Sequence, residues 1–338
     1  MADHVTQLPV TPASRFRIAS LSKPLTAVAV LKLVDDGKLS LDDKMVDLLG
    51  LVHKEDYREP RISLITVRQL LQHYAGWDRE RTGDPMFQAR KIADELGVDS
   101  PPSKMQIRQS VLQRRLDNHP GGKYAYSNFG YLILGQIIEE VSGQTYVEYV
   151  QANLLKPLGL NSFQLGRTLP AERLRNEVSY YARGKKWDSV FASNPEAKVR
   201  PPYGGFCLEA MDAHGGWVAT ASDLALFASA VDLLGDNLLS PESVQTMVAR
   251  YPVDGQSTTE PVYYGCGWLV RELNNSTGKN IWHGGALPGS SSLMVARHDG
   301  FTWAVLFNGR YSPKRESLVN IIDPLMHKVV DKAWPSTN

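Results

Sequence analysis

The sequence places a serine and a lysine three residues apart at the start of an apolar segment. Ser20 and Lys23 lie in the stretch R-F-R-I-A-S-L-S-K-P-L-T, in which Pro24 directly follows Lys23. Proline is tolerated in the first turn of a helix, so a helix is expected to begin close to Ser20, with Lys23 one turn along on the same face. An amine that loses hydration has a lowered pKa and can activate a weakly nucleophilic hydroxyl. The alternative is an ordinary N-cap serine beside a lysine that extends to solvent.

A second candidate group is a phenol and an amide in the stretch G-G-K-Y-A-Y-S-N-F-G-Y. A phenol whose pKa is lowered by a nearby ammonium can carry protons between nucleophile and leaving group, which is the role predicted for Tyr126. The amide of Asn128 can hold the lysine or a substrate carbonyl. The alternative interpretation is a turn whose aromatic residue packs in the core.

A third candidate group follows in the stretch N-I-W-H-G-G-A-L-P-G. Gly284 and Gly285 have no side chain to pack on a strand, which suits a backbone edge that a ligand approaches closely. The backbone N–H groups of Ala286 and Ser20 would then form an oxyanion hole. His283 is expected to orient the substrate or to assist proton transfer. A glycine turn in a hairpin is the alternative.

Two apolar segments predict the buried helices that carry the first two groups. Residues 24–36 and 129–142 are apolar around the whole helix circumference, and Gly37 and Gly143 follow them as helix ends. A capping box at Thr66-Val-Arg-Gln69 predicts a shorter helix, and two more are expected to begin near Thr220 and Ser240. The polar, proline-containing residues 78–120 predict a surface excursion with one or two weak helices.

The later part of the chain predicts an antiparallel sheet. Short β-branched and aromatic runs, separated by turn residues, predict strands over 264–273, 291–297 and 301–308. A closing helix is expected over 314–333. The predicted class is therefore α+β, an antiparallel sheet flanked by helices with an inserted mainly helical domain. The division expected is an α/β domain of residues 1–45 plus 212–338 and an inserted domain of residues 46–211, which carries the Tyr-Ser-Asn loop and the variable pocket loops.

Composition excludes several other classes. The 338 residues are 43% hydrophobic, and the formal net charge of +1 gives no electrostatic field for nucleic acid. No apolar run approaches the ~18 residues of a membrane span, and the start M-A-D-H-V-T-Q-L-P-V lacks the features of a signal peptide. We therefore expect a cytoplasmic protein, or a periplasmic or secreted one if the sequence begins late.

Other hydrolytic and redox chemistries lack their motifs. The chain contains no G-x-S-x-G elbow, no H-E-x-x-H zinc motif and no G-x-G-x-x-G following a strand. Cys207 and Cys266 fit no metal spacing and are expected to be free thiols. His73 and His214 are interpreted as structural. No metal or cofactor is predicted.

The order S-x-x-K, Y-S-N and H-G-G resembles the serine β-lactamase-like superfamily, which includes class C β-lactamases, D-alanyl-D-alanine carboxypeptidases, D-aminopeptidases and class VIII esterases. The phrases L-L-Q-H-Y-A-G, L-K-P-L-G-L-N and G-G-W-V-A-T-A-S-D-L-A match as well, so the resemblance covers roughly residues 15–330. It implies a β-lactamase or penicillin-binding transpeptidase-like fold. It also implies Ser20 as the acylated nucleophile, Lys23 as its deprotonating partner, Tyr126 as general base and acid, and Asn128 as a positioning residue. Whether Lys23 or Tyr126 takes the first proton stays open at this point.

The third motif departs from the family pattern. His283, Gly284 and Gly285 stand where the β-lactamases usually have K-T-G, whose ammonium and hydroxyl bind a substrate carboxylate. A neutral histidine and a bare glycine hold a carboxylate less well, which favours small esters or uncharged amides over β-lactams. The expected protein is a serine esterase or amidase. The alternatives are a D-amino-acid peptidase, penicillin-binding protein or weak β-lactamase, and a catalytically poor penicillin-binding sensor or scaffold.

The N-terminus is the second departure. Family members have strands before the S-x-x-K helix, whereas here residues 1–15 precede it and include Pro9 and Pro12. Proline blocks ladder hydrogen bonds except at an edge, so the N-terminal strands are expected to be short or missing. An open sheet edge would favour a homo-oligomer.

Overall fold

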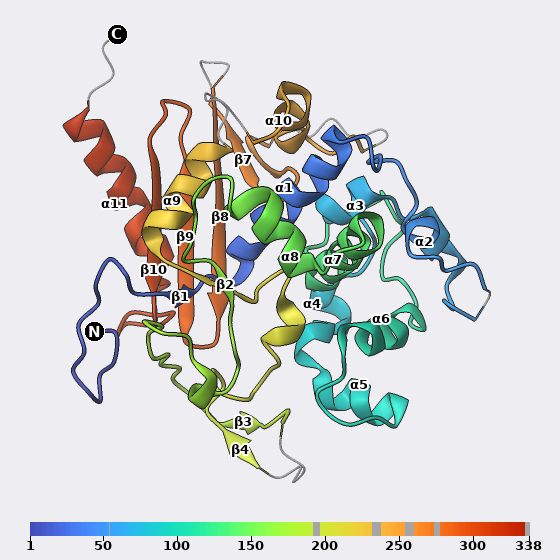
Figure 1. Ribbon diagram of the computed structural model, residues 1–338, viewed down its shortest axis with the longest axis horizontal. Helices are drawn as coiled ribbons and strands as arrows, with labels where there is room; N and C mark the ends of the chain where they lie inside the picture. The colour runs from blue at the N-terminus through green and yellow to red at the C-terminus, as the bar shows by residue number, and fades with distance from the viewer. Residues whose placement is uncertain (54, 192–196, 232–237, 254–259, 274–277, 335–338) are drawn as a thin grey trace.

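A five-stranded antiparallel sheet is the centre of the fold (Figure 1). The computed structural model describes all residues except 54, 192–196, 232–237, 254–259, 274–277 and 335–338. The strand order is β10-β9-β8-β7-β6. The strands are β6 (Val262–Tyr264), β7 (Leu269–Glu272), β8 (Lys279–Leu287), β9 (Ser290–Ala296) and β10 (Thr302–Phe307). This mixture of helices and an antiparallel sheet confirms the predicted class.

The strands differ from the prediction at two places. The expected strand over 264–273 is two strands, because the chain turns at Gly265, whose N–H donates to the Trp268 carbonyl at 2.8 Å. The H-G-G motif lies within β8, the longest strand of the sheet. Strand β7 pairs with β8 only as far as Trp282. From His283 onward, the edge of β8 that faces β7 therefore has no partner strand in the described part of the chain.

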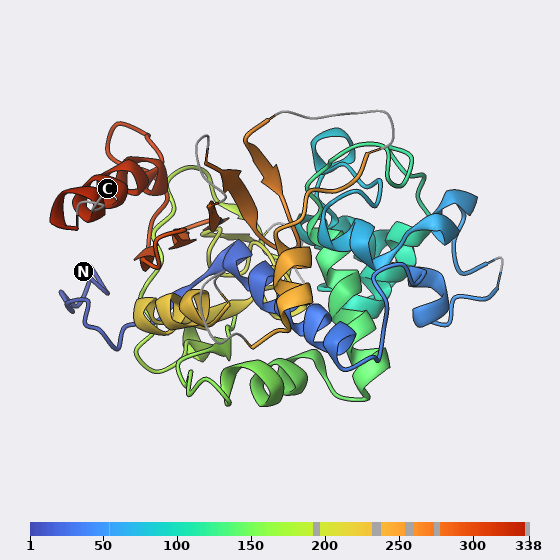
Figure 2. The same ribbon diagram turned by 90° about the horizontal axis from the view of Figure 1, so that it is seen from above.

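Helices cover both faces of the sheet (Figure 2). One face, which includes Met294, packs on α1 and α9 through residues such as Leu25 and Phe227. The other face packs on α11, where Val295 and Trp303 contact Val330. The helices beside the sheet are α1 (Ser22–Asp35), α9 (Ala221–Ala230), α10 (Pro241–Met247) and α11 (Leu318–Ala333).

The remaining helices gather beside one edge of the sheet (Figure 1). They are α2 (Met45–Leu48), α3 (Val67–Leu71), α4 (Arg79–Thr82), α5 (Ala89–Leu96), α6 (Lys104–Leu112), α7 (Asn128–Ser142) and α8 (Tyr146–Val150). The segment 78–120 is more helical than predicted. It also reaches the core, since Ile92 and Val111 are buried in the main apolar cluster, so it is only partly a surface excursion. Its few apolar residues give a weak periodic signal, and tertiary contacts stabilise the helices.

Several predicted helix ends are confirmed. The capping box at Thr66 has both hydrogen bonds, and Gly143 ends α7 in the left-handed conformation at φ +69°. Ser240 caps α10 directly before Pro241. Helix α3 ends at Leu71, and α11 begins at Leu318 rather than near residue 314. Helix α9 begins directly after its cap Thr220, as predicted, and ends at Ala230.

A small second sheet connects distant parts of the chain. Its order is β1-β5-β2, and a separate hairpin pairs β3 with β4. The bounds are β1 (Phe16–Arg17), β2 (Gln164–Leu165), β3 (Trp187–Asp188), β4 (Lys198–Val199) and β5 (Trp217–Ala219). Strand β2 lies in the segment predicted as an inserted domain, whereas β1 and β5 lie outside it. The two-domain division stays a prediction.

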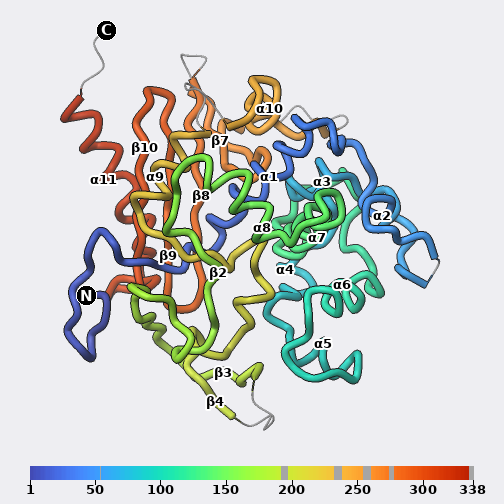
Figure 3. The backbone as a smooth tube through the Cα atoms, viewed as in Figure 1, coloured from blue at the N-terminus to red at the C-terminus, as the bar shows by residue number. Residues whose placement is uncertain are grey.

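The N-terminal segment contributes no strand to the large sheet. Residues before β1 take part in two isolated bridges, Asp3–Leu8 and Arg15–Glu177. They lie beside the end of β10 (Figure 3), where the Asn308 side chain donates to the Met1 carbonyl at 3.1 Å. Strand β10 is an edge strand among the described residues. This confirms the expectation of short or missing N-terminal strands. In the described chain, no helix combines the length and apolarity needed to cross a membrane.

Candidate active site

Ser20 lies in a 3-10 turn, Ala19–Leu21, directly before α1. Helix α1 begins at Ser22, which agrees with the expected helix start close to Ser20. Three residues complete one turn of a 3-10 helix, so Lys23 still lies next to Ser20. Ala19 has φ +52°, which a residue with a Cβ rarely adopts and which costs about 1–3 kcal/mol. A hydrogen bond of 2.7 Å from the Ser22 hydroxyl to the Ala19 carbonyl holds this turn.

The Lys23 ammonium group is buried and makes three polar contacts. Its Nζ lies 3.2 Å from Ser20 Oγ, 2.6 Å from Asn128 Oδ1 and 3.1 Å from the His214 carbonyl oxygen. The side chain does not reach solvent, since the residue is 0% exposed. Burial lowers the pKa of Lys23 well below its ordinary value, partly opposed by the Asp84 carboxylate. A neutral amine at this place can accept a proton from the serine.

Tyr126 also contacts the serine. Its hydroxyl is hydrogen-bonded to the Ser20 side chain, and Lys23 Nζ lies 4.7 Å from the centre of its ring. The Arg79 guanidinium lies 4.5 Å from the same ring centre. Burial raises the pKa of Tyr126, although the bond to Ser20 and the charge of Arg79 oppose this. The expectation of a lowered pKa is therefore wrong, because desolvation outweighs the nearby cations. The phenol can still pass a proton on as a neutral group.

Asn128 is held by an acid that the sequence did not indicate. Its Nδ2 donates to Asp84 Oδ2 at 2.5 Å, which leaves Oδ1 to accept from Lys23. Asp84 also caps the 3-10 turn Pro85–Phe87, since its side chain accepts from the Met86 N–H. A D-P pair gives a capping signal and no catalytic one. Asp84 was therefore missed, as was Arg79, in a segment interpreted as surface.

The H-G-G motif lies next to the serine. Gly285 faces the backbone before Ser20, and a Cβ placed on it would overlap the Ile18 carbonyl oxygen. Gly284 has open space, since the nearest atom to such a Cβ is the Ser292 carbonyl oxygen at 3.9 Å. Both glycines were predicted to let a ligand approach the backbone closely. Only Gly284 leaves room for a ligand in the site. Gly285 admits the protein's own backbone.

His283 is buried and contacts groups of two strands, β6 and β8. Its Nε2 lies 2.9 Å from the Tyr264 hydroxyl, and its Nδ1 lies 2.7 Å from the Gly284 carbonyl oxygen. Burial, followed by the charge of Lys23, lowers the pKa of His283 to about 3. The imidazole is therefore neutral at ordinary pH, as expected.

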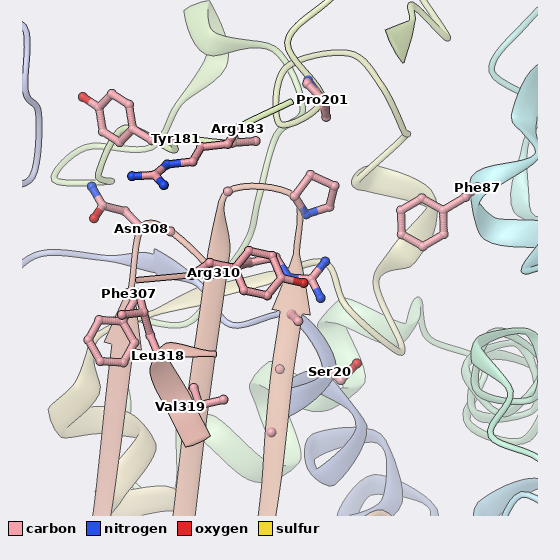
Figure 4. Close-up of a pocket in the computed structure, with 18 of the residues that line it drawn as sticks. Ser20, Phe87, Tyr181, Arg183, Pro201, Phe307, Asn308, Arg310, Leu318 and Val319 are labelled. Carbon is pink, nitrogen blue, oxygen red and sulfur yellow. The ribbon is translucent and has the colours of Figure 1, made fainter. Parts of the chain in front are cut away.

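Ser20, Tyr126 and the H-G-G motif line one cleft of about 1000 Å³, whereas Lys23 and Asn128 are buried and do not line it. Figure 4 shows Ser20 on one side and Phe87 on another. Ala286, the exposed residue of β8, lines the same cleft. The structure thus brings Ser20 and all three motifs together, and an oxyanion hole formed by the N–H groups of Ser20 and Ala286 stays a prediction. Among the described residues, no three metal-ligating side chains form a group.

The two histidines interpreted as structural have backbone roles. His73 accepts from the Ser127 N–H at 3.2 Å through Nδ1, and His214 offers its carbonyl oxygen to Lys23. Burial lowers the pKa of both imidazoles well below the ordinary value. Cys207 and Cys266 are free thiols, as predicted.

Comparison with known proteins gives the class. The family model described as Beta-lactamase matches residues 1–323. This match covers nearly the whole chain, so the protein belongs to the beta-lactamase family, whose hydrolases share the serine β-lactamase fold. The resemblance found in the sequence is thereby confirmed.

Two curated relatives illustrate the range of names within the family. Penicillin-binding protein 4* of Bacillus subtilis (strain 168) is 27% identical over 306 residues, which are 87% of this chain and 60% of that protein. The putative fimbrial assembly protein FimD, serogroup D, of Dichelobacter nodosus is 35% identical over 184 residues, 54% of this chain and 42% of that protein. The chain therefore spans about half the length of these relatives.

Solved structures share the fold. D-amino acid amidase from Ochrobactrum anthropi SV3, complexed with L-phenylalanine, superposes with a TM-score of 0.73 at 23% identity over 98% of this chain and 89% of that one. The octameric penicillin-binding protein homologue from Pyrococcus abyssi gives a TM-score of 0.68 at 24% identity, over 96% and 69% of the two chains.

Proposed function

We propose that this protein is a serine hydrolase that forms an acyl-enzyme on Ser20 and cleaves small esters or amides. The observation that carries the proposal is the 3.2 Å contact between Ser20 Oγ and the buried Nζ of Lys23. A serine hydroxyl needs a base within hydrogen-bond reach to become an effective nucleophile, and a desolvated lysine supplies one.

The opposite pKa shifts of the two candidate bases favour Lys23 as the first one. Burial lowers the pKa of the Lys23 amine, which favours its neutral form, and raises the pKa of the Tyr126 phenol, which disfavours the phenolate. Lys23 therefore takes the Ser20 proton as Oγ attacks the substrate carbonyl. The oxyanion is held by the N–H groups of Ser20 and Ala286. Tyr126 then gives its proton to the leaving group and recovers one from Lys23.

Hydrolysis of the acyl-enzyme reverses these roles. Water gives one proton to the base and its oxygen to the acyl carbon, and Ser20 Oγ leaves with a proton. Asn128, fixed by Asp84, keeps the amine beside the serine throughout. No group outside the described site is required for the proton balance.

The substrate class follows from the groups nearest the nucleophile. His283 is neutral, and Gly284 adds neither charge nor hydroxyl. A carboxylate next to the scissile bond finds no fixed cation from this motif, so esters and uncharged amides are favoured over β-lactams. The proposed partner is a small-molecule substrate.

A D-amino-acid peptidase or penicillin-binding activity is the second candidate. It is favoured by the names of the relatives, which include penicillin-binding protein 4* and D-amino acid amidase. The same nucleophile would act, on an amide or a β-lactam. A penicillin sensor or scaffold with little turnover would instead capture a β-lactam covalently and release it slowly.

One labelling experiment tests the proposed nucleophile. The protein is incubated with a fluorophosphonate or p-nitrophenyl acetate, and its intact mass is measured within seconds. We expect one adduct on Ser20 and none on Ser20→Ala, with activity reduced by about 10³-fold or more in that variant. An unmodified protein, or an adduct that persists in Ser20→Ala, contradicts the proposal. Nitrocefin and a D-alanyl dipeptide, assayed alongside p-nitrophenyl esters, separate the candidates.

We also propose a homo-oligomer that pairs through β10. Strand β10 is an edge of the sheet among the described residues, and a solved relative is octameric. An unpaired edge strand offers backbone hydrogen bonds to another chain. Light scattering after size exclusion should give a mass that is a multiple of 37.6 kDa. A monomer at micromolar concentration would rule this out.

A further inference from the structure

Three basic side chains lie in the cleft away from the three motifs. Arg183 and Lys185 belong to the loop before β3, and Arg310 follows β10. In the view of Figure 4, Arg310 lies between Ser20 and Arg183. We call these three residues the distal basic site.

The distal basic site has no acidic counterpart. No Asp or Glu of the described chain lines the cleft, and none forms an ion pair with these three residues. The cation–π partner of Arg310 is the ring of Tyr311, 5.2 Å away. Some basic groups elsewhere are matched by acids, as Lys104 is by two carboxylates. Three positive charges in one cleft repel one another when no acid is near. An anion that enters the cleft relieves this repulsion and is attracted by all three side chains.

Sheet geometry sets the distance between the strand that leads to Arg310 and the strand beside the nucleophile. Phe307 of β10 pairs with Ser291 of β9, which pairs with Ala286 of β8. Neighbouring strands lie about 4.8 Å apart, so the end of β10 is about 10 Å from the strand beside Ser20. This span corresponds to a chain of about six to eight carbon atoms.

Apolar and aromatic side chains line much of the cleft. Phe307, Tyr311 and Leu318 line the cleft near Arg310, and Phe87 and Trp187 line it opposite. Such a surface favours an apolar body, whereas the basic groups favour a charged end. The two parts of the cleft therefore differ: the cation beside Tyr126, Arg79, is paired with Glu80, whereas the distal basic site has no acidic partner among the described residues.

We infer that the distal basic site selects substrates that carry a carboxylate about six to eight carbons from the scissile carbonyl. The inference rests on the proposed function and names its substrate class. It is distinct from carboxylate binding beside the nucleophile, which His283 and Gly284 do not favour. The scissile bond itself stays uncharged, and the anion is held by Arg310 with Arg183 and Lys185.

The test compares two esters of equal length. p-Nitrophenyl octanoate and the mono-p-nitrophenyl ester of suberic acid both have eight-carbon acyl chains, and the suberate is too long for its own carboxylate to attack the ester readily. We expect kcat/KM for the suberate ester to exceed that for the octanoate by about tenfold at low salt. The ratio should fall several-fold in 0.5 M NaCl, because salt screens exposed charges.

Matched variants attribute the preference to named residues. Arg310→Ala and Lys185→Ala should each lower the suberate-to-octanoate ratio about threefold to tenfold, and Arg310→Lys should retain part of it. Lys314→Ala and Lys186→Ala are the controls, since these lysines are neighbours outside the cleft lining. They should leave the ratio unchanged.

Two results would overturn the inference while the proposed function stands: a ratio near one in the unaltered protein, or a ratio that Arg310→Ala does not change. If neither ester is cleaved and Ser20 is not labelled, the proposed function fails instead. In that case calorimetric titration of the unaltered protein with suberate decides the inference. Binding that weakens in Arg310→Ala supports it, and no binding contradicts it.

Discussion

Gly285 of β8 lies directly against the carbonyl oxygen of Ile18, two residues before the nucleophile candidate Ser20. A Cβ on Gly285 would overlap that oxygen and the Ser292 hydroxyl. The same hydroxyl donates to the Ile18 carbonyl at 2.7 Å. The distance between β8 and the turn that carries Ser20 is therefore set by the absence of a side chain at one position.

Gly285→Ala should consequently displace the strand from the turn. Overpacking costs about 1–3 kcal/mol, and a shift of about 1 Å in a reacting group lowers the rate about 10²-fold. Urea unfolding and ester hydrolysis measure the two effects. Gly284→Ala is the control for stability, because its Cβ would have 3.9 Å to the nearest atom. Its free energy of unfolding should change by less than about 0.5 kcal/mol, and equal destabilisation of both variants would contradict the argument.

The pH dependence of hydrolysis should follow Lys23. Burial lowers the pKa of this amine, and only its neutral form accepts the Ser20 proton. We expect kcat/KM to fall as the pH falls through that lowered pKa. His283, with its pKa of about 3, stays neutral above that value and should add no step between pH 5 and 8. A pH profile of His283→Gln that lacks the acidic fall would contradict the assignment to Lys23.

Lys23 should also affect the pH dependence of stability. Its pKa is lowered in the folded protein relative to the ordinary 10.5. Between these two values the unfolded chain binds more protons, so the contribution of Lys23 to stability rises with pH in this window. Urea unfolding of the wild type and of Lys23→Met at pH 7 and 9 measures it. The free energy of unfolding should increase more between pH 7 and pH 9 in the wild type than in Lys23→Met. Equal increases would show that the pKa of Lys23 is not lowered.

Tyr126→Phe should reveal the proton donor through the leaving group. A poor leaving group needs a proton as the bond breaks, whereas p-nitrophenolate leaves without one. We expect a loss of about 10²–10⁴-fold for an ethyl ester or an amide. The acylation rate with the p-nitrophenyl ester, measured in the first turnover, should fall clearly less. Losses of the same size with both substrates would remove this role from Tyr126.

His73 should act as a positioning residue for the Tyr126 loop. The Ala125 N–H donates to the His73 carbonyl at 2.9 Å, and the Ser127 N–H donates to His73 Nδ1 at 3.2 Å, so both sides of Tyr126 are held. Loss of the side-chain bond in His73→Ala should lower kcat about fivefold to tenfold with little change in KM.

The conservative variant distinguishes positioning from a general loss of structure. His73 has φ +65°, a conformation that asparagine adopts more readily than most residues. His73→Asn keeps an acceptor and should recover part of kcat. A rise in KM alone, or equal activity of both variants and the wild type, would contradict the role.

Much of the local structure could be predicted because it depends on neighbouring residues. The cap at Thr66 and the end of α7 at Gly143 have local causes, and both are observed. Gly284 and Gly285 were placed on a strand as part of the H-G-G motif, although no β-branched or aromatic run predicted that strand. The helices of residues 78–120 were underestimated, since they are stabilised by contacts such as those of Ile92 with distant core residues.

In the candidate site too, some features follow from local sequence and others depend on the whole fold. Asp84 was missed because a capping aspartate and one that fixes Asn128 have the same local sequence. The direction of the Tyr126 pKa was wrong because burial is a property of the whole fold. Local sequence indicated which groups were present, and it could not indicate how far each was removed from water.

By itself, the sequence determined the chemical groups, their order along the chain and the helices and turns that carry them, because caps, spacing and apolar periodicity act over a few residues. Only the tertiary structure decided that Lys23 is buried beside Ser20, that Gly285 admits Ile18, and that Arg310 shares the cleft. These relationships join residues far apart in the chain, and packing and desolvation fix them once the core has formed.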